Sequence, residues 1–204
     1  ALALLVTGGL YAAAPTDFDL GVSPATTVTK GEAGTVVQGS GTVDMVLTTR
    51  IGDVTGWSFG ASLEVEGDTT AAITSVQFTD DVNAVNGGVP AGFNNTSWYP
   101  EDLATSTKVN TPGTDGIAAS GVTQGIVVDM GATNTLPVTT DFAMLEVTVQ
   151  YQGTVPSGGP ETVAQLVYGH EVVGTPATAT VVVQSGQSIP PAVQGMGEFQ
   201  LEEA

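Results

Sequence analysis

Apolar and polar residues alternate with a period of two along much of the chain. Such alternation is typical of a β-strand with one buried and one exposed face. The clearest example is the segment 57–65, where every second side chain is apolar: Trp57, Phe59, Ala61, Leu63 and Val65. The pattern predicts further strands at 18–28, 42–48, 73–78, 125–130, 143–151, 162–168 and 177–183. It predicts that Trp57, Phe59, Leu63, Val147 and Val149 face the core, and that Glu64, Glu66, Glu146 and Thr148 face solvent.

Segments rich in glycine and proline separate these strands, as at 85–90, 111–113 and 155–160. Helical periodicity is weak throughout, although residues 101–108 fit one helical turn or a short helix. Residues 83–120 show the least strand-like pattern, which predicts a long excursion between strands. Many strands joined by turns predict an all-β protein, a single β-sandwich with jelly-roll or Greek-key topology. We place this domain at 16–186, between an extended apolar N-terminal arm at 1–15 and a short C-terminal tail at 187–204.

The composition agrees with this architecture. The chain has 204 residues with 27 Gly and 11 Pro, and it is rich in Val and Thr, which favour extended backbone. A chain of this size removes roughly 70% of its unfolded surface from water, which is enough for a full core. The chain contains no cysteine, which excludes disulfides, thiolate metal sites and cysteine nucleophiles.

The charge is strongly acidic. Three basic residues, Lys30, Arg50 and Lys108, stand against 21 Asp and Glu, for a formal net charge of −18. Nucleic acid is close to excluded as a partner, and anionic lipid is disfavoured, because both need many Lys and Arg. A surface poor in Lys and rich in Thr is typical outside cells, so we expect a secreted, extracellular or cell-surface protein. Such a charge suits saline water or divalent cations, and an acidic surface without a ligand explains it equally well.

The candidates for catalysis are few. His170 is the one side chain suited to act as a base at neutral pH. The chain lacks the Gly-x-Ser-x-Gly turn that presents a hydrolase nucleophile. Acidic residues are plentiful, but no pair stands out as the two carboxylates of a glycosidase. We therefore expect no enzyme, and a sandwich hydrolase remains a third hypothesis.

Oxygen ligands for a metal ion cluster at two places. Asp80, Asp81 and Asn83 lie close together in one predicted loop, and Asp17 and Asp19 share one strand face. Neither set has the spacing of an EF-hand. They are candidates for a structural Ca²⁺ site, with solvated loops as the alternative, and we expect no other cofactor.

The long excursion contains two further features. Asn94 and Asn95 begin overlapping glycosylation sequons. Trp98 and Tyr99 follow in a segment rich in Gly and Pro. Exposed rings there would stack on a sugar or a partner, whereas rings turned inward would cap the open end of the core, which is the interpretation we favour.

The order of these features resembles the cohesin-like family of extracellular bacterial β-sandwiches. The turn at 30–34 (KGEAG) is similar to the family's G-x-x-G-D-T-V turn, and 54–63 is similar to its G-f-x-f-x-l strand. The segments 41–47, 73–76, 141–149 and 177–183 follow in the family's order, so the resemblance covers residues 18–185. It implies a β-sandwich with an extracellular scaffold or adhesion role and no catalysis.

The first residues of the chain read ALALLVTGGLYAAAP. A bilayer span needs about 20 apolar residues, and Gly8 and Gly9 interrupt this stretch, so we expect no membrane insertion. A signal peptide fits its length, but the basic residues of such a peptide are missing. The segment either packs on its own sandwich or adds as a strand to a neighbouring subunit. We favour the second, with Leu2, Leu4 and Val6 as the assembly residues.

Two functional hypotheses follow. In the first, the protein is a non-enzymatic extracellular structural subunit that assembles with copies of itself. Strand exchange between cohesin-like sandwiches would then build a filament, tube or surface layer. In the second, the protein is a monomeric cohesin-like module that binds a dockerin-like peptide or a polysaccharide. The size of the purified protein in solution distinguishes the two.

Overall fold

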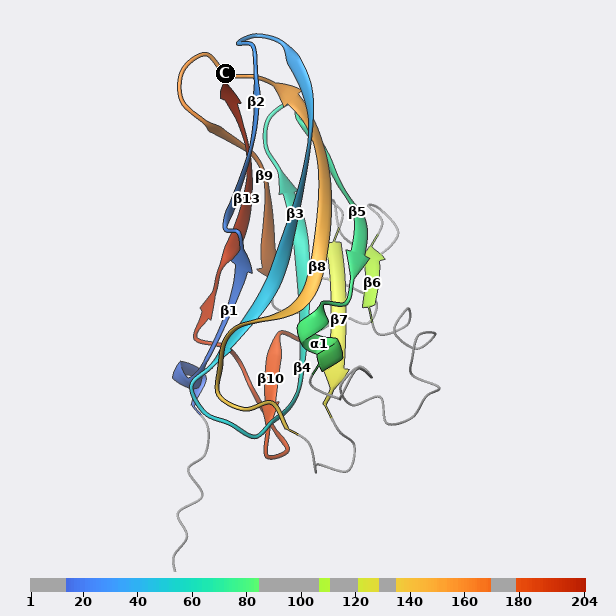
Figure 1. Cartoon of the computed structure of the whole chain (residues 1–204), viewed down its shortest axis with the longest axis vertical. Coiled ribbons are helices and arrows are strands. Elements are labelled where there is room, and N and C mark those ends of the chain that lie inside the picture. The colour runs from blue at the N-terminus through green and yellow to red at the C-terminus, as the bar shows by residue number, and fades with distance from the viewer. Residues whose placement is uncertain (1–13, 85–106, 111–120, 129–134, 170–178) are drawn as a thin grey trace, which may run out of the picture.

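The computed structural model describes residues 14–84, 107–110, 121–128, 135–169 and 179–204. These residues form two sheets packed face to face (Figure 1), which confirms the predicted β-sandwich. The order in sheet A is β12 (Val193–Gln194), β1 (Phe18–Ser23), β3 (Val36–Thr49), β8 (Thr139–Thr154) and β5 (Thr70–Gln77). The order in sheet B is β11 (Gln187–Ile189), β10 (Val181–Gln184), β4 (Val54–Val65), β9 (Glu161–Gly169), β13 (Met196–Glu203) and β2 (Thr26–Gly31). β10 pairs with residues 54–58 of β4 and β9 pairs with residues 60–65, both along one edge of that strand. Along its opposite edge β4 pairs with β7 (Gly121–Val127), which pairs with β6 (Thr107–Asn110).

The core lies between the sheets and is lined by the side chains that alternation turns inward. Trp57 is 2% exposed, and Phe59, Leu63, Val147 and Val149 are 0% exposed, as predicted. The residues predicted to face solvent are exposed or half-buried, namely Glu64, Glu66, Glu146 and Thr148. The alternation therefore identifies correctly which face of each of these strands is buried.

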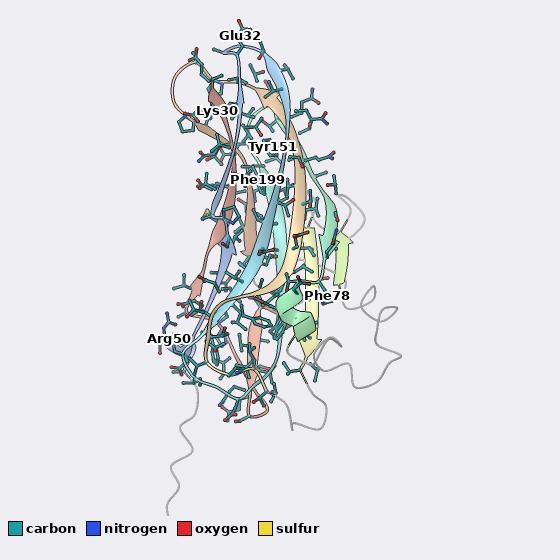
Figure 2. The ribbon with its side chains drawn as sticks, viewed as in Figure 1. Lys30, Glu32, Arg50, Phe78, Tyr151 and Phe199 are labelled. Atoms are coloured by element: carbon teal, nitrogen blue, oxygen red, sulfur yellow. The ribbon has the colours of Figure 1, made fainter. Side chains whose placement is uncertain are left out.

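Aromatic rings and hydrogen bonds join the two sheets. The rings of Tyr151 in sheet A and Phe199 in sheet B lie 5.6 Å apart between the layers (Figure 2). Trp57 meets Phe142 edge to face at 5.7 Å, a favoured geometry for aromatic pairs. The hydroxyl of Tyr151 also forms a 2.8 Å hydrogen bond with that of Thr29 on β2.

The first strand of the domain changes sheets part-way along its length. The sequence predicts one strand at 18–28, whereas the structure divides it at Pro24 into β1 in sheet A and β2 in sheet B. Proline has no backbone N–H to donate to a ladder, so the change of sheet falls where pairing is interrupted anyway. The last strands follow the same course, with β12 in sheet A and β13 in sheet B.

The structure places residues 187–204 inside the sandwich instead of in a tail. β13 pairs with β9 on one side and β2 on the other, and Phe199 and Leu201 are 0% exposed. These two apolar side chains alternate with polar ones, so the segment buries one face like any other strand. The predicted arm at 1–15 overlaps the described residues only at its end, where Pro15–Asp17 form a short 3-10 helix.

The described residues contain little helix. The α-helix, α1 (Asp80–Ala84), was not expected from the sequence. Thr79 caps it, because its Oγ1 accepts a 3.3 Å hydrogen bond from the backbone N–H of Val82. No helix in this part of the chain is long and apolar enough to cross a membrane. Of the predicted helical segment 101–108, residues 107–108 belong to β6 and the rest lies outside the described residues.

Candidate functional site

Many residues singled out in the sequence lie outside the described part of the chain. These are Leu2, Leu4, Val6, Asn94, Asn95, Trp98, Tyr99 and His170. Of the metal candidates, Asp80 and Asp81 begin α1, and Oδ2 of Asp81 accepts a 2.9 Å hydrogen bond from the backbone N–H of Ala143. Asn83 follows in α1, and Asp19 forms an ion pair with Arg50. Among the side chains described, no group of three or more His, Cys, Asp or Glu could hold a metal ion.

The structure assembles an acidic groove that the sequence did not reveal. It has a volume of about 560 Å³ and lies where β3, β5 and β8 meet α1, beside Phe78 (Figure 2). Asp44 on β3 stands directly opposite Glu146 on β8, which stands opposite Gln77 on β5. The remaining lining residues are Thr79, Asp80, Asp81, Asp141 and Ala143. The acidic residues come from separate segments, so only the strand register brings them together.

The charges in this groove act on Asp44. Burial raises the pKa of Asp44 above its ordinary value of 3.8, and the negative charges of Glu146 and Asp81 raise it further. The two basic side chains described, Lys30 and Arg50, pair elsewhere, with Glu202 and Asp19. Among the side chains described, the carboxylates of the groove therefore have no basic partner.

The outer side of sheet B carries small residues along β4. Trp57, Phe59 and Leu63 point into the core, so the residues between them point outward. The outward residues of this part of β4 are all small, namely Gly56, Ser58, Gly60 and Ser62. Gly56 and Gly60 are buried, and Ser58 and Ser62 are half-buried.

Five larger apolar side chains border this strip, and we call them the valine face: Val127, Val167, Val181, Val183 and Met196. The strand register places them on the outer side, with Val167 opposite Ser62, Val181 opposite Ser58, and Val127 and Val183 flanking Gly56. Met196 stands opposite Val167. Met196 is 44% exposed and Val127 is 43% exposed, while the other three are half-buried. These side chains lie on the side of the sheet away from the core.

Polar side chains border the valine face along β9 and β13. The carboxylate of Glu198 accepts hydrogen bonds from Nε2 of Gln165 at 3.4 Å and from Nε2 of Gln200 at 3.0 Å. Nε2 of Gln200 also lies 3.3 Å from Oγ1 of Thr162. Glu64 stands directly opposite Gln165. The apolar strip thus has a polar margin on this side.

The outer side of sheet A differs in character. Over β3, β5 and β8 it presents hydrogen-bonding side chains, among them Gln38, Ser40, Thr42, Thr70, Thr148, Gln150 and Gln152. A shallow hollow of about 210 Å³ lies between Gln38, Gln150 and Thr70. Val36 is the exposed apolar side chain at the tip of this face. The two faces of the sandwich are therefore chemically distinct.

The buried hydroxyl groups of Tyr168 and Thr180 have structural partners. The hydroxyl of Tyr168 donates a 3.0 Å hydrogen bond to the carbonyl of Gly21, and burial raises the pKa of Tyr168 well above its ordinary value. The hydroxyl of Thr180 donates at 2.6 Å to the carbonyl of Gly169. Among the described residues these groups tie strands together, and none forms a pair suited to acid–base catalysis.

Comparison with known proteins gives no match to a family profile and no match to a curated protein. Solved structures do match. One is a chain of the CaDoc0917–CaCohA2 complex, with 15% identity, a TM-score of 0.47, and coverage of 92% of this chain and 99% of that chain. Another is a chain of the complex between the third ScaB cohesin of R. flavefaciens and a group 1 dockerin, with 16% identity, a TM-score of 0.40, and coverage of 93% and 98%. The chain is similar in fold to cohesin domains.

The valine face was missed from the sequence for a physical reason. Its valines come from three strands, and each sits in a run where neighbouring residues are also apolar, as in Val181-Val182-Val183. Alternation alone does not say which of the three valines is buried. The structure shows that Val182 is the buried one, at 0% exposed, so that Val181 and Val183 face outward.

Proposed function

We propose that this protein is a non-catalytic recognition module that binds another protein through the valine face. The observation that carries this proposal is the apolar strip on the outer side of sheet B, with its polar margin at Glu198. Protein interfaces typically have an apolar centre and a polar rim, and contiguous exposed apolar patches commonly mark interaction sites. The core is closed beneath this strip, since Phe59, Ala61 and Leu63 are 0% exposed.

The partner we propose is a dockerin-like protein segment, the class that the sequence resemblance implies. A net charge of −18 would attract a partner with a basic surface and speed its association at low salt. We further propose an extracellular or cell-surface location, which the Lys-poor, acidic composition supports. A polysaccharide has less support, because every aromatic ring in the described strands is buried.

Gly125 offers a direct test of the valine face. It stands opposite Ser58, and a Cβ placed there would meet no heavy atom within 4 Å. Gly125→Arg should therefore fold normally while covering the strip with a long charged side chain. Gln150→Arg adds the same charge to the exposed outer side of sheet A and is the matched control.

The experiment compares capture of secreted and cell-surface proteins of the source organism by the three immobilised domains. We expect the original domain and Gln150→Arg to retain the same protein, identified by mass spectrometry, and Gly125→Arg to lose it. That protein, once purified, should bind the original domain in calorimetry with the same response to each variant. Equal retention by both variants would overturn the valine face as the binding site.

Self-assembly by strand exchange is the second candidate function. The observation that favours it is the edge of sheet A, where β5 pairs with β8 and with no other described strand. Unpaired backbone groups on such an edge can accept a donated strand. A register shift between Ile73 and Ser75 marks a bulge in β5, and bulges protect edges against such pairing. Recognition through the valine face is therefore the better supported of the two.

A further inference from the structure

The edge of sheet A beside β8 is built differently in its upper and lower parts. The upper part of β8 pairs with β5, and this ladder ends where Gln77 stands opposite Glu146. β8 extends beyond this pair as far as Thr139, and there it still pairs with β3 on its other side. No described strand continues β5 along this lower stretch, residues 139–145. α1 lies there instead, below β5 and beside β8 (Figure 1).

Two side chains at the start of α1 take the place of the missing strand. Oδ2 of Asp81 accepts a 2.9 Å hydrogen bond from the backbone N–H of Ala143. Oγ1 of Thr79 donates a hydrogen bond to the carbonyl of the same residue. In an antiparallel ladder, one residue of a neighbouring strand satisfies these two groups with its own backbone. The two side chains therefore imitate one residue of a neighbouring strand.

α1 is fixed in this position by its own contacts. Val82 is 0% exposed and belongs to the hydrophobic core. The hydroxyl of Thr79 joins the helix to the edge of β8, because it accepts a 3.3 Å hydrogen bond from the backbone N–H of Val82 and donates to Ala143. Asp81 is exposed, so packing does not require its carboxylate, and its described hydrogen bond is the one to the edge.

An uncovered edge at this place would allow copies of the chain to pair. Unpaired N–H and C=O groups of an edge strand form a template for another strand. Every copy carries the same edge, so two copies can pair antiparallel about a twofold axis. Proteins prevent such pairing with bulges or by covering the edge with a helix. The bulge between Ile73 and Ser75 protects β5, and the lower edge of β8 needs another device.

We propose that α1 is an edge cap that prevents β8 from pairing with a second copy of the chain. The cap consists of Thr79 and Asp81, is held in place by Val82, and covers the edge at Ala143. Displacement of the cap leaves both backbone groups of Ala143 open to a strand of the second copy. This role is separate from recognition by the valine face, which lies on sheet B.

Amide hydrogen exchange followed by NMR measures whether the edge opens. Asp81→Ala removes the acceptor for the N–H of Ala143 and leaves Val82 in the core. Asp80→Ala is the matched control, because it removes the same charge from an exposed position one residue earlier in α1. We expect the amide of Ala143 to exchange about tenfold faster or more in Asp81→Ala and to be unchanged in Asp80→Ala. An unchanged rate in Asp81→Ala would overturn the proposal.

Sedimentation at increasing protein concentration measures whether the open edge takes a second copy. Concentrated NaCl is present throughout, because it screens the repulsion between copies that each carry a net charge of −18. We expect Asp81→Ala to form dimers in which the amide of Ala143 regains its protection, while the original protein and Asp80→Ala remain monomers. Monomers of Asp81→Ala at every concentration, dimers in which Ala143 stays unprotected, or equal association of all three proteins would overturn the proposal.

A second pair of variants decides if Asp81→Ala does not fold. Thr79→Val keeps the shape of the side chain and removes the hydroxyl that donates to the carbonyl of Ala143. Thr74→Val is its control, because this exposed hydroxyl on β5 donates to another carbonyl of β8, that of Thr148, at 3.4 Å. We expect dimers of Thr79→Val and monomers of Thr74→Val in the same sedimentation experiment. The same state in both variants would overturn the cap.

Discussion

Trp57 and Gln124 face each other inside the sandwich, where Nε1 of the indole donates a 2.9 Å hydrogen bond to Oε1 of the amide. Nε2 of Gln124 donates in turn to the carbonyl of Met144 in sheet A, at 3.3 Å. Gln124 is 0% exposed, so its polar atoms depend on these partners. One side chain thereby satisfies a buried indole and joins the two sheets.

Replacement of this amide should be costly. In Gln124→Leu the indole N–H of Trp57 and the carbonyl of Met144 lose their partners while remaining buried. We expect the free energy of unfolding to fall by about 1–3 kcal/mol, the usual cost of an unsatisfied buried polar group. Urea unfolding followed by tryptophan fluorescence measures this. A variant as stable as the original protein would show that the hydrogen bonds of Gln124 contribute nothing to the free energy of unfolding.

The core should respond strongly to the loss of a ring at its centre. Phe59 is 0% exposed, and its ring lies 5.5 Å from that of Tyr168, edge to face. Phe59→Ala should lower the free energy of unfolding by about 3–5 kcal/mol, through lost burial and the cavity left behind. Gln150→Ala, at an exposed position of β8, is the control and should stay within about 0.5 kcal/mol. A cost below about 1 kcal/mol at Phe59 would contradict the observed packing.

Alternation predicted the strands because it is a local property. Whether Phe59 or Glu64 faces the core depends on its place in a single strand, and the sequence contains that information. The five residues predicted to face the core in β4 and β8 are accordingly buried, whereas Val65, on the same predicted face of β4, is 37% exposed. The same logic extends to β13, where Phe199 and Leu201 alternate with polar residues, although the domain boundary was drawn before it.

Contacts between distant segments could not be predicted from alternation within single strands. The acidic groove depends on the register that places Asp44 opposite Glu146, and these two residues are separated by about half of the chain. Gln124 was missed because a polar residue in a strand is expected to face water, and only its partners explain its burial. The valine face and the edge cap at α1 depend likewise on which segments become neighbours.

The acidic groove should make stability depend on pH through Asp44. The folded state raises the pKa of this carboxyl above 3.8, so its ionised form is disfavoured by folding. The resulting destabilisation is fully present above the raised pKa and disappears as the pH falls toward the unfolded value. We therefore expect Asp44→Asn to melt higher than the original protein at pH 7, with a difference that shrinks just above pH 3.8.

A second variant separates this local effect from net charge. Asp68→Asn removes the same charge in the exposed turn before β5. We expect it to raise the melting temperature less than Asp44→Asn does at neutral pH. Equal gains from the two variants, constant across the pH range, would mean that general repulsion explains the effect and that the groove does not.

Salt should stabilise the protein by screening its own charge. A net charge of −18 makes the folded state repel itself in dilute buffer, and added ions weaken that repulsion. We expect the melting temperature to rise with NaCl. CaCl₂ at matched ionic strength tests the structural Ca²⁺ hypothesis, because a further rise that is abolished in Asp80→Asn would support it. Identical shifts in the two salts would remove the hypothesis.

Removal of residues 1–10 decides between recognition and strand exchange. The described core closes without them, since β1 begins at Phe18, so the shortened protein should fold and melt close to the full-length chain. As a recognition module, the full-length protein should sediment as a monomer at high concentration, like the shortened form. Large particles or filaments that form in the full-length protein and vanish on deletion would contradict this. They would show that Leu2, Leu4 and Val6 enter a neighbouring subunit and that strand exchange is the function.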